Sequence, residues 1–339
     1  EDADPDPEPG IGRGEEGVVL RVEANCREPE LVDGGIGDAA VKAAPDALAL
    51  DPERGRRNRV GPLDCVATLV EGAPGGEGLR LADRAEAADL AARDGILSAR
   101  AMIDLYGQIW ADPEVEGEAK DRSATLRNAY VAADPAARLE AIRTLWGDGE
   151  AVFARQVLTA YASARLPVDT ELVGDPAPFI ASMLAAGLDR NAMRWGSVVG
   201  EGSYAWGLLA LAQPSRQGTV GSGALDEFID DDDSVEKRKS QFLVAGLAGL
   251  GRLDMDDAED AADRLGVSLT RDSRWARAID RAGEYRNPAL AALLAGLGMQ
   301  GNGWDKMTAR HVFHIVRALD RAGLSAEARM IAAEAVARG

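Results

Sequence analysis

Residues 275–283 read Trp-Ala-Arg-Ala-Ile-Asp-Arg-Ala-Gly, and residues 315–323, forty positions later, read Ile-Val-Arg-Ala-Leu-Asp-Arg-Ala-Gly. The two stretches are identical at six of nine positions, and residues 263–266 repeat the ending as Asp-Arg-Leu-Gly. Arginine in the last turn of a helix complements the helix dipole, and a glycine shortly after it can adopt a left-handed cap. A period near forty residues with two helices per unit is typical of α-solenoids. The sequence therefore predicts an all-α fold, a solenoid-like array of helical hairpins.

This outline resembles tetratricopeptide-type and HEAT-type arrays, which also stack pairs of helices. The tetratricopeptide pattern of Trp, Gly, Tyr and Pro at fixed offsets is absent. The resemblance therefore indicates the architecture and not the family. The other interpretation is that two similar stretches coincide by chance in a chain rich in alanine and arginine.

Apolar residues recur at intervals of three and four from Leu81 onward, and Gly, Pro or Asp-Pro interrupts them every 12–20 residues. Asp134-Pro135 marks one helix boundary, because proline disfavours helix at the preceding residue and suits the first turn. We therefore assign residues 81–339 to the helical-repeat array. The helices expected in it are 81–93, 96–110, 115–132, 135–146, 150–164, 176–187, 190–199, 203–212, 223–230, 234–251, 255–266, 271–283, 287–298, 304–322 and 325–338.

The beginning of the chain has a different character. Residues 1–17 are acidic and proline-rich, which predicts a linker that cannot bury a core. Residues 18–80 predict a small irregular or β cap at the head of the array. Two β-branched runs in this part, residues 17–22 and 65–70, are candidate strands.

The two cysteines of the chain, Cys26 and Cys65, both belong to this predicted cap. Cys26 follows the first run and Cys65 opens the second, so antiparallel pairing would bring the thiols close enough for a disulfide. Two separate buried thiols are the alternative. A disulfide and an acidic tether at the start favour a periplasmic or secreted protein. A trimmed cytoplasmic protein is the other possibility.

The net charge of −19 disfavours nucleic acid as a partner, because an acidic surface repels phosphates. No apolar run approaches the ~18 residues that a membrane-spanning helix needs. The sequence thus predicts neither nucleic-acid binding nor a membrane span.

Candidate catalytic and metal motifs are weak. His311 and His314, the only histidines, have the His-x-x-His spacing, but no further ligand lies near them in sequence, and packing at a helix–helix interface explains them better. Ser234 and Lys237 have the Ser-x-x-Lys spacing without its companion motifs, so a helix start is expected there. Residues 35–40 fit a loose Gly-x-Gly-x-x-Ala pattern but lack a proper preceding strand. We predict no catalytic residues, no metal site and no cofactor.

Two charge clusters have simple structural explanations. The acidic run Asp230–Asp233 lacks the spacing of a calcium loop and suits the N-terminus of a following helix. A basic island in the predicted cap could bind a phosphate, a lipid headgroup or an acidic partner, or could pair with the acidic surface of the chain itself. Its members are Arg54, Arg56, Arg57 and Arg59.

Aromatic residues beside glycines are the strongest candidates for a binding surface. Trp and Tyr are favoured anchors of interfaces, and residues 195–207 concentrate two Trp and one Tyr among glycines. The alternative is that each Trp fills the gap between successive helix pairs. The predicted binding residues are Trp146, Trp195, Tyr204, Trp206 and Trp304.

These observations favour a non-enzymatic protein-binding or scaffold protein of the bacterial cell envelope, with another protein or a peptide as its partner. One alternative is a glycan-acting enzyme on a helical toroid that uses paired carboxylates. Another is a cytoplasmic acidic regulator of a basic protein. The enzymatic question stays open with a preference for no enzyme, and the oligomeric state is not predicted.

Overall fold

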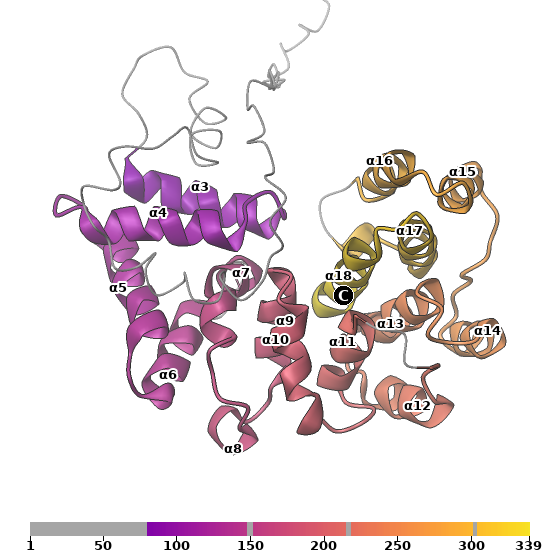
Figure 1. Cartoon of the computed structure of the whole chain (residues 1–339), viewed down its shortest axis with the longest axis horizontal. Coiled ribbons are helices and arrows are strands. Elements are labelled where there is room, and N and C mark those ends of the chain that lie inside the picture. Colours follow the sequence, from indigo (N-terminus) through magenta and orange to yellow (C-terminus); the bar gives the residue numbers. More distant parts are fainter. Residues whose placement is uncertain (1–79, 148–151, 215–217, 301–303) are drawn as a thin grey trace, which may run out of the picture. The chain divides into compact units, whose positions relative to one another are not determined.

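The computed structural model describes residues 80–147, 152–214, 218–300 and 304–339. All regular structure in these ranges is helical (Figure 1), so the predicted all-α class is confirmed for the described part of the chain. The predicted linker and the cap up to residue 79 lie outside the described residues. They include Cys26, Cys65, the Gly-x-Gly-x-x-Ala pattern at 35–40, both candidate strands and the Arg54–Arg59 island.

Sixteen α-helices and three 3₁₀ helices follow one another along the described residues. The α-helices are α3 (Leu81–Arg93), α4 (Ala99–Ala111), α5 (Glu118–Val131), α6 (Pro135–Trp146), α7 (Val152–Ser163), α8 (Thr170–Val173), α9 (Ala177–Ala185), α10 (Asp189–Ala192), α11 (Tyr204–Ala212), α12 (Ser222–Asp231), α13 (Arg238–Gly249), α14 (Met255–Arg264), α15 (Arg274–Glu284), α16 (Pro288–Gly298), α17 (Ala309–Arg321) and α18 (Ser325–Arg338). The 3₁₀ helices are η1 (Met193–Ser197), η2 (Val235–Lys237) and η3 (Trp304–Lys306).

Polar side chains at the N-cap position set where several helices begin. Asp134 Oδ1 accepts a hydrogen bond from the amide of Ala136 at 3.0 Å, and Pro135 occupies the first turn of α6, as the Asp-Pro signal predicts. Hydroxyl, carboxylate or amide oxygens cap further helices in the same way. These residues are Ser98, Asp169, Ser203, Ser273, Asn287 and Thr308.

Three ranges expected as single helices are divided, and one short helix, α8, was not expected. The range 234–251 divides because Glu236 and Lys237 have left-handed backbones, with φ of 56° and 54°, so that η2 ends before α13. The range 304–322 becomes η3 and α17, since the Thr308 side chain caps a new helix start. The range 190–199 is divided between α10 and η1.

The repeated endings, Arg-Ala-Gly twice and Arg-Leu-Gly once, have different roles. Gly266 and Gly323 are left-handed, with φ of 70° and 92°, which agrees with the expected cap. The expected cap at Gly283 is wrong, because this glycine lies inside α15 in an ordinary helical conformation. A Cβ at Gly283 would lie 2.8 Å from the Cα of Ala318. Glycine at this position therefore allows α15 and α17 to pack closely.

The last helix, α18, packs against α9, α11, α13 and α17. Arg329 on α18 donates to the carboxylate of Asp189 at 2.8 Å, across a separation of 140 residues. Arg338 donates to the carbonyl of Arg93, 245 residues away, at 3.0 Å. Open solenoids are held together by contacts between neighbouring repeats. These long-range contacts of α18 are an additional feature that the forty-residue period does not predict.

The core consists mainly of alanine and aliphatic side chains, as the low aromatic content of 5% suggests. In α7, α13 and α18, small residues let neighbouring helices approach closely. Gly246 illustrates this, because an added Cβ would meet Leu211 Cδ2 at 2.8 Å and Ala332 Cβ at 3.1 Å. The central helices α11, α13 and α18 are thereby held against each other, and α11 is the helix that carries the candidate site.

Candidate functional site

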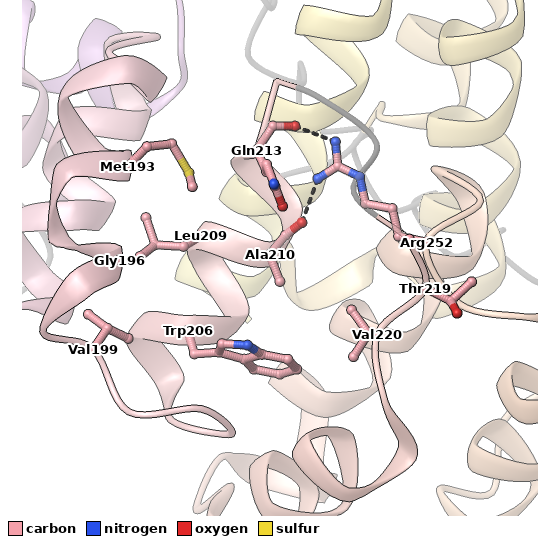
Figure 2. Close-up of a pocket in the computed structure, with 11 residues that line it drawn as sticks. Met193, Gly196, Val199, Trp206, Leu209, Ala210, Gln213, Thr219, Val220 and Arg252 are labelled. Atoms are coloured by element: carbon pink, nitrogen blue, oxygen red, sulfur yellow. Dashed lines mark hydrogen bonds between the residues drawn. The ribbon is translucent and has the colours of Figure 1, made fainter.

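A pocket of about 210 Å³ lies between η1, the helix α11 and the segment 218–220 (Figure 2). Its wall is mainly apolar, with one indole ring and a few polar groups. The described lining residues are Met193, Gly196, Val199, Trp206, Leu209, Ala210, Gln213, Gly218, Thr219, Val220 and Arg252.

The start of α11 sets the position of Trp206. Ser203 caps the helix by accepting a hydrogen bond from the amide of Trp206 at 3.2 Å, and its hydroxyl donates to the carbonyl of Gly200 at 2.7 Å. The indole is half-buried. One residue further on, a Cβ at Gly207 would lie 2.6 Å from the ring of Phe228, so glycine is needed there for α11 to approach α12.

The end of α11 is held by two buried arginines. The last carbonyl groups of a helix lack intrahelical donors. Arg252 donates to the carbonyl of Leu211 at 2.9 Å and also to those of Ala210 and Gln213, and the Ala210 and Gln213 bonds are visible in Figure 2. Arg329 donates to the carbonyl of Ala212. Four successive carbonyls at the end of α11, from Ala210 to Gln213, therefore have cationic donors.

Arg252 also fixes the opposite wall. Its own carbonyl accepts a hydrogen bond from the amide of Val220 at 2.7 Å, which ties the segment 218–220 to the turn after α13. The guanidinium of the same residue binds the end of α11, so one residue holds both walls, through its backbone carbonyl and its side chain. The geometry of the pocket is thus built from three separate parts of the chain.

The pocket suits an apolar group more than a reacting one. Its described lining residues include no carboxylate, thiol or imidazole, so they supply no ordinary general acid or base. Gln213 and Thr219 can orient a polar atom at the rim. A volume of about 210 Å³ is below the roughly 300–1,000 Å³ of small-molecule sites. The pocket is therefore suited to one inserted side chain.

Three of the five predicted binding residues lie on η1 or α11, the two helices that border this pocket. Trp206 lines it, whereas Trp195 on η1 is only 1% exposed and belongs to the core beneath. Tyr204 is half-buried, with its ring centroid 6.5 Å from that of Phe228 and the ammonium of Lys239 4.8 Å from its own. Burial raises the pKa of the Tyr204 phenol, so this side chain stays neutral.

The other two predicted residues lie elsewhere in packed surroundings. Trp146 packs against Phe179 in a tilted arrangement, with ring centroids 4.9 Å apart, and its indole N–H donates to Thr159 Oγ1 at 2.8 Å. Trp304 is 8% exposed, and its indole N–H donates to Glu334 Oε1 at 3.3 Å. Their contacts are those of side chains that fill gaps between helices.

Sequence reasoning did not find Arg252, Gln213 or the 218–220 segment. Arg252 follows Gly251 in an ordinary helix-end context, and its carbonyl partners are about forty residues away, at separations of 39 to 42. No local spacing connects these positions. Only the Gly- and Trp-rich stretch 195–207 carried a signal.

A buried ionic cluster joins α3, α4, α5 and α7 outside the pocket. Asp89 pairs with Arg155, and Arg122 lies 3.5 Å from the same carboxylate oxygen. Both arginines also donate to the hydroxyl of Tyr106, at 3.1 and 3.2 Å. Burial raises the pKa of Asp89, and the two arginine charges oppose that shift. The cluster connects four helices and shares no residue with the Trp206 pocket.

The two histidines lie at the contact of α15 with α17, where packing was expected. His314 is buried and its Nδ1 is 3.0 Å from Asp280 Oδ1, while Arg317 donates to Asp280 Oδ2 at 2.5 Å. His311 packs on Trp275 with ring centroids 4.8 Å apart. Within the described ranges, no three His, Cys, Asp or Glu side chains are grouped to hold a metal ion.

The Ser234 and Lys237 side chains form hydrogen bonds that stabilise the segment between α12 and α13. Asp232 accepts hydrogen bonds from the hydroxyl of Ser234 at 2.6 Å and from the amide of Ser240 at 2.7 Å, and these bonds lower the pKa of Asp232 against the effect of burial. Lys237 Nζ donates to the carbonyl of Ile229 at 2.5 Å. The acidic run therefore does support the start of α13, through Asp232.

No family model matches this chain, and neither the curated proteins nor the solved structures contain a significant match. None of the described helices combines the length and apolarity required to cross a bilayer.

Proposed function

We propose that this chain is a non-enzymatic binding or scaffold protein of the cell envelope, built on helical repeats, which captures a protein or peptide partner. The observation that carries the proposal is the Trp206-lined pocket. An apolar pocket with a rigid indole wall and a few polar groups at its rim is the kind of place where an interface anchor inserts.

The way the pocket is built supports this function. Arg252 holds both walls, so little conformational freedom is lost when a side chain enters, and less of the binding free energy is spent on ordering the site. Among the described lining residues Arg252 is the one titratable group, which favours recognition over acid–base chemistry.

The repeat interpretation has partial support. The helices α15 and α16 pack on each other, as do α17 and α18, and α15 also packs on α17. Two successive hairpins in contact are what a helical-repeat array requires. The proposed periplasmic location is tested separately by mapping the thiol or disulfide state of Cys26 and Cys65 under non-reducing conditions.

Two glycines give a matched test of the pocket. A Cβ at Gly196 would have only Leu209 Cδ1 near it, at 4.0 Å, and a Cβ at Gly200 would have nothing within 4 Å, so both positions accept a side chain. Gly196 lines the pocket and Gly200 does not. Gly196→Leu should therefore fill the pocket, while Gly200→Leu adds the same side chain outside it.

Peptides would be selected from a random display library on the full chain, and their affinities measured for each variant. We expect the selected peptides to share one apolar anchor residue. Gly196→Leu should weaken their binding by about tenfold or more, as loss of an anchor contact does, and Gly200→Leu should leave it unchanged. Equal binding to wild type and Gly196→Leu would remove the pocket from the proposal.

A further inference from the structure

The outward side of α16 is an apolar surface without a partner among the described helices. Leu290, Leu293 and Leu297 are 42%, 70% and 53% exposed, and they recur at helical spacing on one face. Residues 287–304 include no charged side chain. Only Ala291 and Ala295 of α16 are buried. Soluble proteins rarely expose such a stripe unless it is an interaction surface.

The neighbouring helix α15 carries positive charge on its exposed side. Of its exposed arginines and those flanking it, only Arg277 forms an ion pair within the part of the chain that the structure describes, with Asp272 at the surface. The exposed set is Arg271, Arg274, Arg277, Arg281 and Arg286. Three carboxylates lie between residues 271 and 286. One of them, Asp280, pairs with His314 and Arg317 of α17 and not with the arginines of α15. This hairpin is thus locally basic in a chain of net charge −19.

The apolar and basic parts form one surface. Both α15 and α16 pack against α17 and against each other, so their outward faces point away from α17 (Figure 1). Trp275 links the two helices, because its indole N–H donates to the carbonyl of Leu294 at 2.9 Å. Tyr285, in the turn between them, is 78% exposed.

We infer that the outward surface of the α15–α16 hairpin docks an acidic amphipathic helix of a partner protein. The exposed positions beside the leucines are small, namely Ala289, Ala292 and Gly296, which leaves grooves in which another helix can pack closely. The unpaired arginines then meet carboxylates on the flanks of the partner helix. Apolar anchors supply the affinity and the charges orient the helix.

Other occupants fit this surface less well. A second copy docking through the same face would place arginines against arginines. An anionic bilayer would be repelled by the net charge of −19, and small side chains would contribute little to insertion. The hairpin shares no residue with the Trp206 pocket, so this inference goes beyond the proposed function and can fail independently of it.

The test uses the full chain and a display library of helical peptides with a fixed leucine stripe and freely varied Asp, Glu, Lys and Arg on its flanks. We expect selection to enrich Asp and Glu. Leu293→Gln should reduce the affinity of the chain for the selected peptides by about tenfold. Val235→Gln, at a residue 82% exposed on η2, is the matched control and should have no effect.

The charge contribution is measured with Arg274→Gln combined with Arg281→Gln. This double variant should weaken binding at low salt and reduce its salt dependence, while circular dichroism stays unchanged because both side chains are exposed. The inference is overturned if selected peptides show no acidic enrichment, or if Leu293→Gln binds them as well as wild type does. It is also overturned if Leu293 is needed instead for binding vesicles with 30% phosphatidylserine, or for self-association measured by light scattering.

Discussion

The two copies of the repeated stretch, in α15 and α17, have nearly the same sequence and very different surroundings. In α17, buried side chains occur all around the helix, which packs against α13, α15, α16 and α18. In α15 one side is buried and the other faces outward with its arginines. Equivalent residues are therefore buried in one copy and exposed in the other. The repeated sequence specifies that both stretches are helices, but not which contacts each position makes.

The largest expected difference concerns the paired glycines Gly283 and Gly323. Gly283→Ala should destabilise the fold by about 2–3 kcal/mol, because its Cβ would press on the backbone of Ala318. Gly323→Ala should cost about 1 kcal/mol through its left-handed φ alone. Urea unfolding of both variants measures this order, and equal costs would contradict the close α15–α17 approach.

The paired aspartates should differ next. Asp280→Asn removes the charge that faces His314 and Arg317 in a largely buried contact, and it should cost about 2 kcal/mol. Asp320 accepts a hydrogen bond from Ser325 at the surface. Asp320→Asn should therefore stay within about 0.5 kcal/mol of wild type. A similar loss in both variants would show that the buried pair is not special.

The paired arginines give a smaller contrast. Arg317 binds Asp280 and lies over the Phe313 ring at 4.4 Å, so Arg317→Gln should cost about 1 kcal/mol. Arg277 pairs with Asp272 where both are more than half exposed. Arg277→Gln should change the free energy of unfolding by less than about 0.5 kcal/mol. Thermal unfolding of both variants measures the two losses of stability. Equal losses would contradict the stronger contacts of Arg317.

The smallest expected effect is a pH dependence of the free energy of unfolding, caused by His311 on α17. Burial lowers the pKa of His311 from 6.5, and Arg310 and His314 act in the same direction. The unfolded chain then takes up the proton first, so stability is complete above about pH 6.5 and decreases as the pH falls below it. His311→Gln should flatten this step in unfolding measurements between pH 7 and 5.

A second decrease in stability should follow at lower pH. The hydrogen bonds from His314 and Arg317 outweigh burial and lower the pKa of Asp280. This contribution is present above about pH 4 and is lost as the pH falls further. It should remain in His311→Gln and disappear in Asp280→Asn.

The helices were largely predictable because their signals are local. The expected bounds of α3, α6 and α18 agree with the structure, since apolar spacing and boundary residues such as Pro135 act within a few positions. The division before α13 was not predictable, because nothing in the sequence marks Glu236 and Lys237 as left-handed. The pocket was predictable only at Trp206, since Arg252 reaches carbonyls 39 or more residues away.

The sequence by itself determined that the described chain is helical, where most of its helices begin and end, and that its surface is acidic. Each of these depends on neighbouring residues or on composition. The tertiary structure alone decided that Gly283 is a contact and Gly323 a cap, and that Trp195 is buried while Trp206 lines a pocket. It also decided that the leucines of α16 are left exposed. The physical reason is that burial depends on which helices meet, and those meetings join residues far apart in the chain.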